Sequence, residues 1–255
     1  MTLVLTPLRD IPLIHPGDDL VQVITNGLTD TSIWLNDNDI IVLAQKIISK
    51  AEGRLVDLNQ VIPSKQAKKI ALEADKDARF VELILRESRK ILRVRPGLII
   101  AEHKNGFICA NAGIDHSNVQ GEPGCDGEWV LLLPGDPDSS ADRIRRGLEE
   151  KTGKSIGVMI IDSHGRAWRL GIVGVTIGLS GVPGIVDMRG EPDLFGRNLR
   201  VTTIGAADEL AAGASLIMGQ AAEMTPIVHV RGFPYQLTES HLSDIIRPED
   251  KDFFR

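Results

Sequence analysis

A tight hairpin is the sequence feature that most constrains the fold. Two apolar runs, at 98–100 and 107–109, flank Lys104-Asn105-Gly106, and an Asn-Gly pair supplies the positive φ angles of a short turn. Residues 97–111 are therefore predicted to form antiparallel strands that deliver the next segment, 111–118, to a surface. Asp115 follows the second strand, where a carboxylate has no packing role, so we predict a chemical role for it.

The segment after the hairpin is rich in oxygen atoms. Asp115, Ser117 and Asn118 lie within four residues, and such a cluster suits a hard cation such as Mg²⁺ or Mn²⁺. The alternative is an Asx turn, in which the side chain bonds its own backbone.

A second acidic position follows an apolar run. Residues 155–161 read as a buried strand that ends before Asp162 and Ser163. A carboxylate just past such a strand lies at the rim of a sheet, where open α/β sheets bind ligands. The two carboxylates are predicted to share a metal and phosphate site. Turn chemistry at Gly165 is the alternative.

The remaining pattern predicts an α+β (mixed α/β) fold, with β-sheets, flanking helices and two intimately connected subdomains. Ser139 or Ser140 is the expected cap of a helix that Gly153 ends. The predicted strands are 2–6, 39–44, 129–133, 155–161 and 227–231, residues 166–180 are extended, and the predicted helices are 18–27, 64–76, 79–91, 139–152 and 207–219.

Two nucleotide-binding motifs are excluded by spacing and order. Lys151-Thr152-Gly153-Lys154-Ser155 resembles the end of a P-loop, but here a helix precedes Gly153 and a strand follows it, the reverse of the P-loop order. Residues 171–178 lack the glycine spacing of a Rossmann fingerprint.

Composition favours a cytoplasmic enzyme. A 255-residue chain with 42% hydrophobic residues can bury a sizeable core. The start of the sequence lacks the pattern of a signal peptide, no transmembrane segment is expected, and Cys109 and Cys125 are expected to be ordinary residues. A net charge of −6 without a basic tract argues against nucleic acid as a partner.

An acidic substrate would require local cations. Of the candidates Lys50, Arg54, Arg166, Arg169 and Arg197, the favoured pair is Arg166 and Arg169, because they lie within a few residues of Asp162 and are predicted to neutralise phosphate there.

Eight glycines lie between residues 165 and 196. One reading is a surface for a flat ring or a phosphate, because glycine lets backbone approach a ligand. The other is a twisted strand pair with a loop, at a subunit interface.

Several segments together resemble one family. The most specific are Ser-Lys-Ala-Glu-Gly-Arg at 49–54 and Asn-Ala-Gly-Ile-Asp at 111–115, in this order and spacing, and further matching pieces lie at 11–14, 162–171, 218–220 and 230–232. The chain is thereby similar to the γ-glutamyl ligases of coenzyme F420 biosynthesis.

That resemblance implies an activity. A single ligase domain over 1–255, without a nitroreductase-like extension, would use GTP to join L-glutamate to the carboxylate of coenzyme F420-0, and then add a further γ-linked glutamate. An acyl phosphate is the expected intermediate. The resemblance also implies a homodimer, Mg²⁺ or Mn²⁺, and K⁺ as an additional ion.

The family's site residues carry over position by position. Asp115, Asp162 and Arg166 are the expected catalytic residues. The metal positions fall on Asp115, Asp162, Ser163 and Gln220, and the nucleotide positions fall on Ile11, Pro12, Leu13, Ile14, Gln45, Lys46, Lys50, Asn118, Met218, Gly219, Gln220, Ala221, Ala222, Glu223, Met224 and Thr225.

Three positions depart from the family pattern. Gln45 and Lys46 stand where some members have small hydroxyl residues near the nucleotide, and Met224 stands where glycine is expected, so the choice between GTP and ATP stays open. The rival functions are a metal-dependent phosphohydrolase and a non-catalytic nucleotide- or deazaflavin-binding protein.

Overall fold

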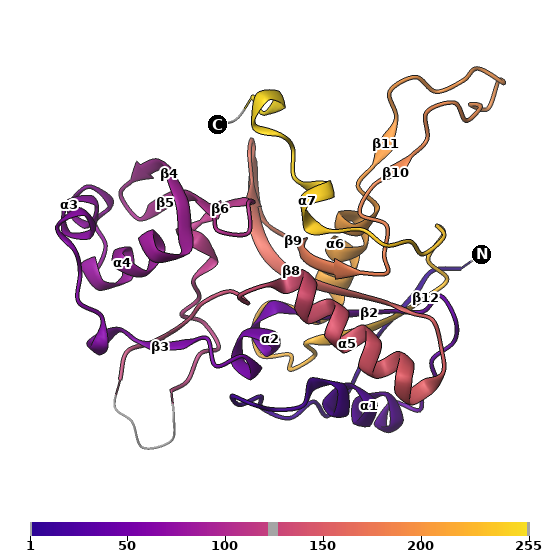
Figure 1. Cartoon of the computed structure of the whole chain (residues 1–255), viewed down its shortest axis with the longest axis horizontal. Coiled ribbons are helices and arrows are strands. Elements are labelled where there is room, and N and C mark those ends of the chain that lie inside the picture. Colours follow the sequence, from indigo (N-terminus) through magenta and orange to yellow (C-terminus); the bar gives the residue numbers. More distant parts are fainter. Residues whose placement is uncertain (1, 122–126, 254–255) are drawn as a thin grey trace.

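A five-stranded mixed sheet forms the centre of the larger lobe. The computed structural model describes residues 2–121 and 127–253, and Figure 1 shows two lobes and a projecting arm. In spatial order the strands are β1 (Val4–Pro7), β12 (Ile227–Arg231), β2 (Ile40–Ala44), β8 (Gly157–Arg166) and β9 (Arg169–Ser180). Only β2 and β8 are parallel to each other; the other neighbours in this sheet are antiparallel.

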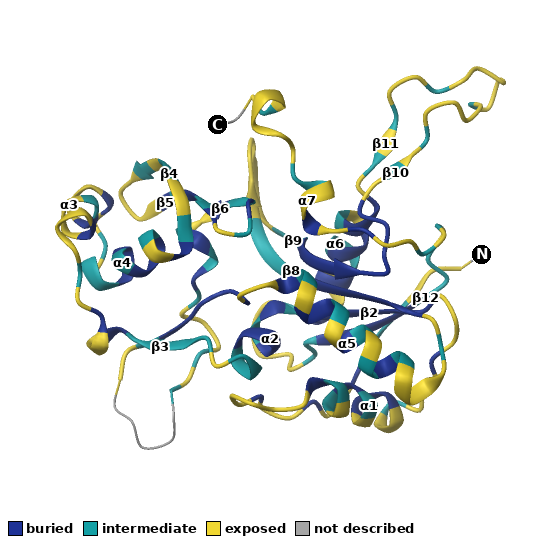
Figure 2. Ribbon diagram, in the orientation of Figure 1, coloured by how far each residue is buried: buried dark blue, intermediate teal, exposed yellow. Residues whose placement is uncertain are grey.

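Helices cover both faces of this sheet. We call the sheet together with these helices the sheet lobe. One face carries α1 (Leu20–Asp30) and α5 (Pro137–Thr152), and the other carries α6 (Ala206–Met218) and α7 (Leu242–Ile245). Each interface has its own apolar core, and buried residues follow the sheet through the lobe in Figure 2. The α+β class is therefore confirmed.

A small lobe, residues 58–114, has a third core. Helices α3 (Lys65–Ala74) and α4 (Ala78–Glu87) pack on an antiparallel sheet of β4 (Ser88–Arg95), β5 (Leu98–His103) and β6 (Ile108–Ala110). Short 3₁₀ turns begin and end it, η1 (Leu58–Gln60) and η2 (Asn111–Gly113).

Three elements lie where the lobes meet. Helix α2 (Gln45–Ala51) follows β2 directly, and a two-stranded ribbon of β3 (Leu55–Asp57) and β7 (Trp129–Leu131) connects the lobes.

The short turn η3 (Glu249–Lys251) lies near the C-terminus.

An arm of residues 182–205 projects from the sheet lobe. It is closed at its base by β10 (Val186–Asp187) paired with β11 (Thr203–Ile204), and it is mostly exposed beyond that pair. No helix in the described part of the chain is long and apolar enough to cross a membrane.

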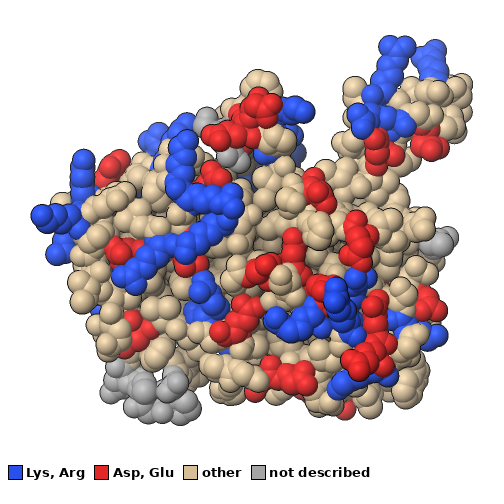
Figure 3. Space-filling model, viewed as in Figure 1, with Lys and Arg blue, Asp and Glu red and all other residues tan. Residues whose placement is uncertain are grey.

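Charges differ between the lobes. On the face in Figure 3, acidic and basic side chains are interspersed over the sheet lobe, whereas Lys and Arg gather over the small lobe. The β4 strand contributes four exposed cations there: Arg89, Lys90, Arg93 and Arg95.

The structure corrects three predicted boundaries. The predicted helix 79–91 ends at Glu87, because residues 88–95 form β4 instead. The strand predicted to end at 161 continues as β8 to Arg166. Helix α5 is capped by the Asp136 carboxylate, which accepts from Ser139 N–H, and not by Ser139 or Ser140.

Other predicted features are confirmed. Gly153 ends α5 in the left-handed conformation, with φ of 67°, and a strand follows it, so the segment is not a P-loop. The hairpin forms as β5 and β6. Cys109 is a buried free thiol, and Cys125 lies outside the described residues.

Candidate active site

A cavity of about 1170 Å³ lies where the two lobes meet. A single small ligand typically occupies a pocket of roughly 300–1,000 Å³, so this cavity has room for more than one substrate. Five segments supply most of its lining: 11–16, 44–50, 110–121, 161–164 and 215–226.

The cavity gathers nearly all of the predicted site residues. Asp115, Asp162, Ser163 and every predicted nucleotide position lie on its lining; Arg166 does not. The Arg166 guanidinium donates to the carbonyl oxygens of Leu170 and Gly171, at the exposed end of the β8–β9 hairpin. The structure therefore does not bring Arg166 to the carboxylates.

Helix α2 holds the Asp115 carboxylate. Gln45 Nε2 donates to Asp115 Oδ2 at 2.6 Å, and Lys46 Nζ lies 2.5 Å from the same oxygen. The buried Ser49 hydroxyl donates to Gln45 Oε1 at 2.9 Å and so fixes that amide. Both donors come from a distant helix, so the carboxylate is not closing a local Asx turn.

Asp162 reaches the cavity because its neighbouring strand is short. The parallel pairing of β2 with β8 ends at Ala44 opposite Ile161, so the next residue of β8 emerges beyond the edge of β2. His164 Nε2 lies 3.0 Å from Asp162 Oδ2. Burial opposes ionisation of Asp162, but the bond and charge of His164, the Ser163 N–H and the charge of Lys46 keep its pKa below the ordinary value.

The opposite face of β8 contributes a hydroxyl. Ser163 Oγ donates to Gln220 Oε1 at 2.9 Å, and Gln220 Nε2 donates to Ser215 Oγ at 3.0 Å. The amide of Gln220 is thereby oriented with its oxygen toward Ser163. Sequence reasoning missed Ser215, because nothing in the local pattern of α6 distinguishes this serine from any other helical serine.

Charge interactions connect the site residues. Burial raises the pKa of Asp115, and the nearby negative charge of Asp162 adds to that rise while Lys46 opposes it. Burial and the positive charge of Lys46 lower the pKa of Lys50. The charges of Asp162 and Lys46 thus reach Asp115, and the charge of Lys46 also reaches Asp162 and Lys50.

Oxygen donors of the kinds that hard divalent cations prefer line the cavity. Among the described residues, no group of three or more His, Cys, Asp or Glu side chains forms a metal cluster. The donor set offered by Asp115, Asp162, Ser163 and Gln220 is instead two carboxylates, a hydroxyl and an amide oxygen. Mg²⁺ and Mn²⁺ accept such ligands and use few protein carboxylates.

Two further segments meet beside these donors. Asn118 Nδ2 donates to Ala221 O at 2.9 Å, and Thr225 Oγ1 donates to Met218 O at 2.9 Å. The loop 218–225 is therefore folded back on itself and held to the segment that carries Asp115.

Two further features lie outside the cavity lining. The His116 ring packs against Phe80, with 4.8 Å between ring centroids, and does not line the cavity. In the glycine-rich segment, a Cβ on Gly174 would lie 2.5 Å from Ser215 Cβ of α6, and one on Gly178 would lie 2.4 Å from Pro137 Cβ of α5. These two glycines let helices pack closely on both faces of β9.

The fold and the cavity define a class of protein: an α+β protein whose lobes enclose a site with carboxylates and lysines, without a P-loop or a Rossmann fingerprint. The chain belongs to the F420-0:gamma-glutamyl ligase family, whose pattern matches residues 9–232.

Three relatives show how far the similarity extends. "Coenzyme F420:L-glutamate ligase" of Methanothermobacter thermautotrophicus is 44% identical and aligns over all of both chains. The protein of that name from Methanopyrus kandleri is 44% identical over 97% of both chains. The one from Archaeoglobus fulgidus is 43% identical over 98% of this chain and 95% of its own.

Proposed function

We propose that this protein is a GTP- and divalent-metal-dependent ligase that joins L-glutamate to the carboxylate of coenzyme F420-0 and then adds a second glutamate through a γ-linkage. One observation carries the proposal. Carboxylates, amide and hydroxyl oxygens and lysines from separate segments line one cavity, in a chain 44% identical along its whole length to a protein named coenzyme F420:L-glutamate ligase.

The chemistry explains why these groups are required together. A carboxylate becomes a good acyl donor once one of its oxygens carries a phosphoryl group from GTP. The glutamate amine then attacks the acyl carbon, the C–N bond forms, and inorganic phosphate leaves with that oxygen. Phosphoryl transfer requires charge neutralisation and alignment more than covalent help from the protein. A bound Mg²⁺ or Mn²⁺ would supply positive charge at the transferring phosphoryl group.

Each group of residues has an assigned role in this proposal. Asp115, Asp162, Ser163 and Gln220 hold the cation. Lys46 and Lys50 neutralise nucleotide phosphate, and the 11–14 and 218–225 segments enclose the nucleotide. Arg166 has no role in this scheme, because its guanidinium is held at the hairpin end.

Mass spectrometry of the deazaflavin tests the function. The protein is incubated with coenzyme F420-0, GTP, Mn²⁺ and L-glutamate, with matched ATP and no-glutamate reactions. We expect a gain of glutamyl units with GTP and none in the Asp162→Ala variant. Phosphate release without glutamate would instead indicate a phosphohydrolase, and binding without any turnover would indicate a binding protein.

We also propose that the protein works as a cytoplasmic homodimer. The support for the homodimer is the arm, where Leu194, Phe195 and Val201 are 92%, 84% and 85% exposed. Exposed apolar side chains grouped on a projecting element are typical of a protein–protein contact.

A further inference from the structure

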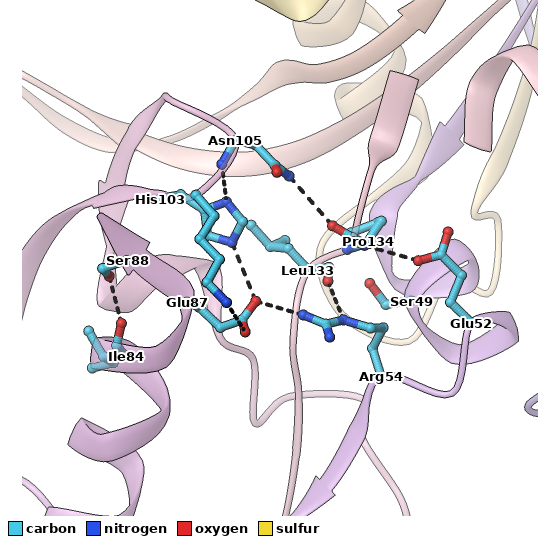
Figure 4. Close-up of polar contacts among 12 residues, drawn as sticks. Ser49, Glu52, Arg54, Ile84, Glu87, Ser88, His103, Asn105, Leu133 and Pro134 are labelled. Atoms are coloured by element: carbon cyan, nitrogen blue, oxygen red, sulfur yellow. Dashed lines mark hydrogen bonds and ion pairs between the residues drawn. The ribbon is translucent and has the colours of Figure 1, made fainter. Parts of the chain in front are cut away.

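A buried polar cluster lies at the junction of the two lobes, outside the cavity. Glu87, the last residue of α4, is 7% exposed. Arg54 Nη2 donates to Glu87 Oε2 at 2.6 Å, and Arg54 Nε donates to Leu133 O at 2.9 Å (Figure 4). One guanidinium thus joins the small lobe to the strand segment that leads toward α5.

His103 closes the cluster as a neutral group. The Asn105 N–H donates to His103 Nδ1 at 3.1 Å, so Nδ1 acts as an acceptor and the ring proton lies on Nε2, 3.8 Å from Glu87 Oε2 (Figure 4). Burial lowers the pKa of His103 to about 4. Lys104 Nζ, on an exposed side chain, is 3.5 Å from Glu87 Oε1, so Arg54 is the better-ordered counter-charge of Glu87.

The cluster connects to the segment that carries Asp115. Leu132 N–H donates to the Arg54 carbonyl oxygen at 3.1 Å, and Asp115 and Leu131 exchange two backbone hydrogen bonds of 2.9 Å. Arg54 is therefore bonded to Leu132 and Asp115 to Leu131, and these two residues are adjacent in the chain.

A second connection leads to Asp162. The His103 ring stacks on Phe107 with 5.1 Å between centroids, and the Phe107 ring lies 5.4 Å from that of His164. His164 in turn contacts the Asp162 carboxylate. The cluster is thus connected to the 131–132 segment, which bonds Asp115, and through Phe107 to His164, which contacts Asp162. It reaches neither carboxylate directly.

We propose that Arg54 and Glu87 are positioning residues. Their ion pair fixes the small lobe, which Asp115 follows directly, against the sheet lobe, which carries Asp162, at the separation that binding of a divalent cation requires. This inference rests on the proposed function. Removing the Glu87 charge leaves the half-buried Arg54 guanidinium without its carboxylate partner, so the junction would rearrange.

Mn²⁺ binding measured by electron paramagnetic resonance, with Mn²⁺ as the sole added ligand, tests the inference. In Glu87→Gln we expect the Kd for Mn²⁺ to rise about tenfold or more, as when groups that orient metal ligands are changed. We also expect kcat to fall while the KM for GTP changes little. Arg86→Met is the matched control, because it removes the ion pair that the exposed Arg86 makes with Glu82 on the same helix.

The outcomes separate two failures. If the wild-type protein does not bind Mn²⁺, or Asp162→Ala binds it equally well, the proposed metal site is wrong. If the wild type binds Mn²⁺ and folded Glu87→Gln keeps wild-type affinity and kcat, the pair is only structural and the inference is overturned. Should Glu87→Gln not fold, Glu87→Asp, which keeps the charge but shortens its reach, decides by the same readouts.

Discussion

The run Ser-Lys-Ala-Glu-Gly-Arg is a specific signature because three of its polar side chains, Ser49, Glu52 and Arg54, have different partners. Ser49 orients Gln45 within α2. Glu52 accepts hydrogen bonds from the Ser140 hydroxyl and the Gly135 N–H, which holds α2 to the start of α5. Arg54 holds the small lobe. A short helix and the turn after it, which together contact the start of α5 and the small lobe, leave little freedom in their polar residues.

Replacing Lys46 should have opposite effects on two ligands. Lys46→Met removes a cation that competes for Asp115 Oδ2, so Mn²⁺ should bind the nucleotide-free protein more tightly. A partly exposed ion pair contributes up to about 1 kcal/mol, or roughly fivefold in Kd. The KM for GTP should rise, because phosphate loses a positive neighbour.

Paired titrations at pH 8 check this prediction. Mn²⁺ affinity is read by electron paramagnetic resonance and the KM for GTP by turnover. Lys154→Met serves as the control, because Lys154 pairs with Asp37 outside the cavity. Weaker Mn²⁺ binding in Lys46→Met would show that this lysine supports the cation instead of competing with it.

His103 should make stability depend on pH. The folded protein keeps the pKa of His103 at about 4, against an ordinary value of 6.5, so between these values the unfolded chain binds more protons. The free energy of unfolding should then fall as pH falls from 6.5 toward 4, by at most about 1.4 kcal/mol per pH unit. Glu87, Arg54, Lys104 and His164 are the charged or titratable groups that act on this ring.

Urea unfolding at several pH values isolates that contribution. The stability advantage of wild type over His103→Gln should shrink between pH 7 and pH 5. If the free energies of unfolding of wild type and His103→Gln changed with pH in parallel, the neutral state assigned to His103 would be contradicted.

Site residues were predictable where local chemistry was unusual. Asp115 and Asp162 are carboxylates next to apolar strands, and no packing demand explains them. Arg166 looked equally suitable by proximity in sequence, but its side chain is directed by the β8–β9 hairpin turn, which extends further than the apolar run indicated. The roles of Ser215 and Glu87 depend on contacts between distant segments, which periodicity does not report.

At the scale of elements, strong local signals gave reliable predictions. Gly106, with φ of 98°, and Gly153, with φ of 67°, end the hairpin strand and the helix through backbone conformation, although Asn105 does not adopt the positive φ that was predicted for it. The β4 strand was missed because Ser-Arg-Lys-Ile-Leu-Arg-Val-Arg continues the polar and apolar mixture of α4. What makes it a strand is its partner β5, and such pairing is tertiary.

Gly174 provides a test of helix packing on β9. A Cβ there would lie 2.5 Å from Ser215 Cβ and 2.6 Å from the Ala211 carbonyl oxygen, so Gly174→Ala should lower the free energy of unfolding by about 1–3 kcal/mol, as overpacking does. Because Ser215 holds Gln220, the KM for GTP should also rise.

Gly165→Ala is the matched control, since no heavy atom lies within 4 Å of a Cβ at that position of the same hairpin. In this variant the free energy of unfolding in urea and the KM for GTP should both stay close to the wild-type values. Equal effects at both glycines would mean that backbone freedom, and not contact with α6, determines the result.

At the scale of the whole molecule, the arm is the element least explained by a single copy of the chain. Its residues extend from the sheet lobe (Figure 1) and place Leu194 and Phe195 in solvent. Neither side chain contributes to the three cores. An element that buries few of its apolar groups is most readily stabilised by a second surface.

Sedimentation equilibrium should therefore show a dimer that depends on the arm. Leu194→Asp with Phe195→Asp should shift the mass toward that of the 27.8 kDa monomer, because a charge placed in an apolar contact loses its hydration without gaining a partner. Leu72→Asp, at an equally exposed apolar position on α3 of the small lobe, should leave the mass unchanged. A wild-type monomer at micromolar concentration, or a double variant of unchanged mass, would mean that the arm does not hold two copies together.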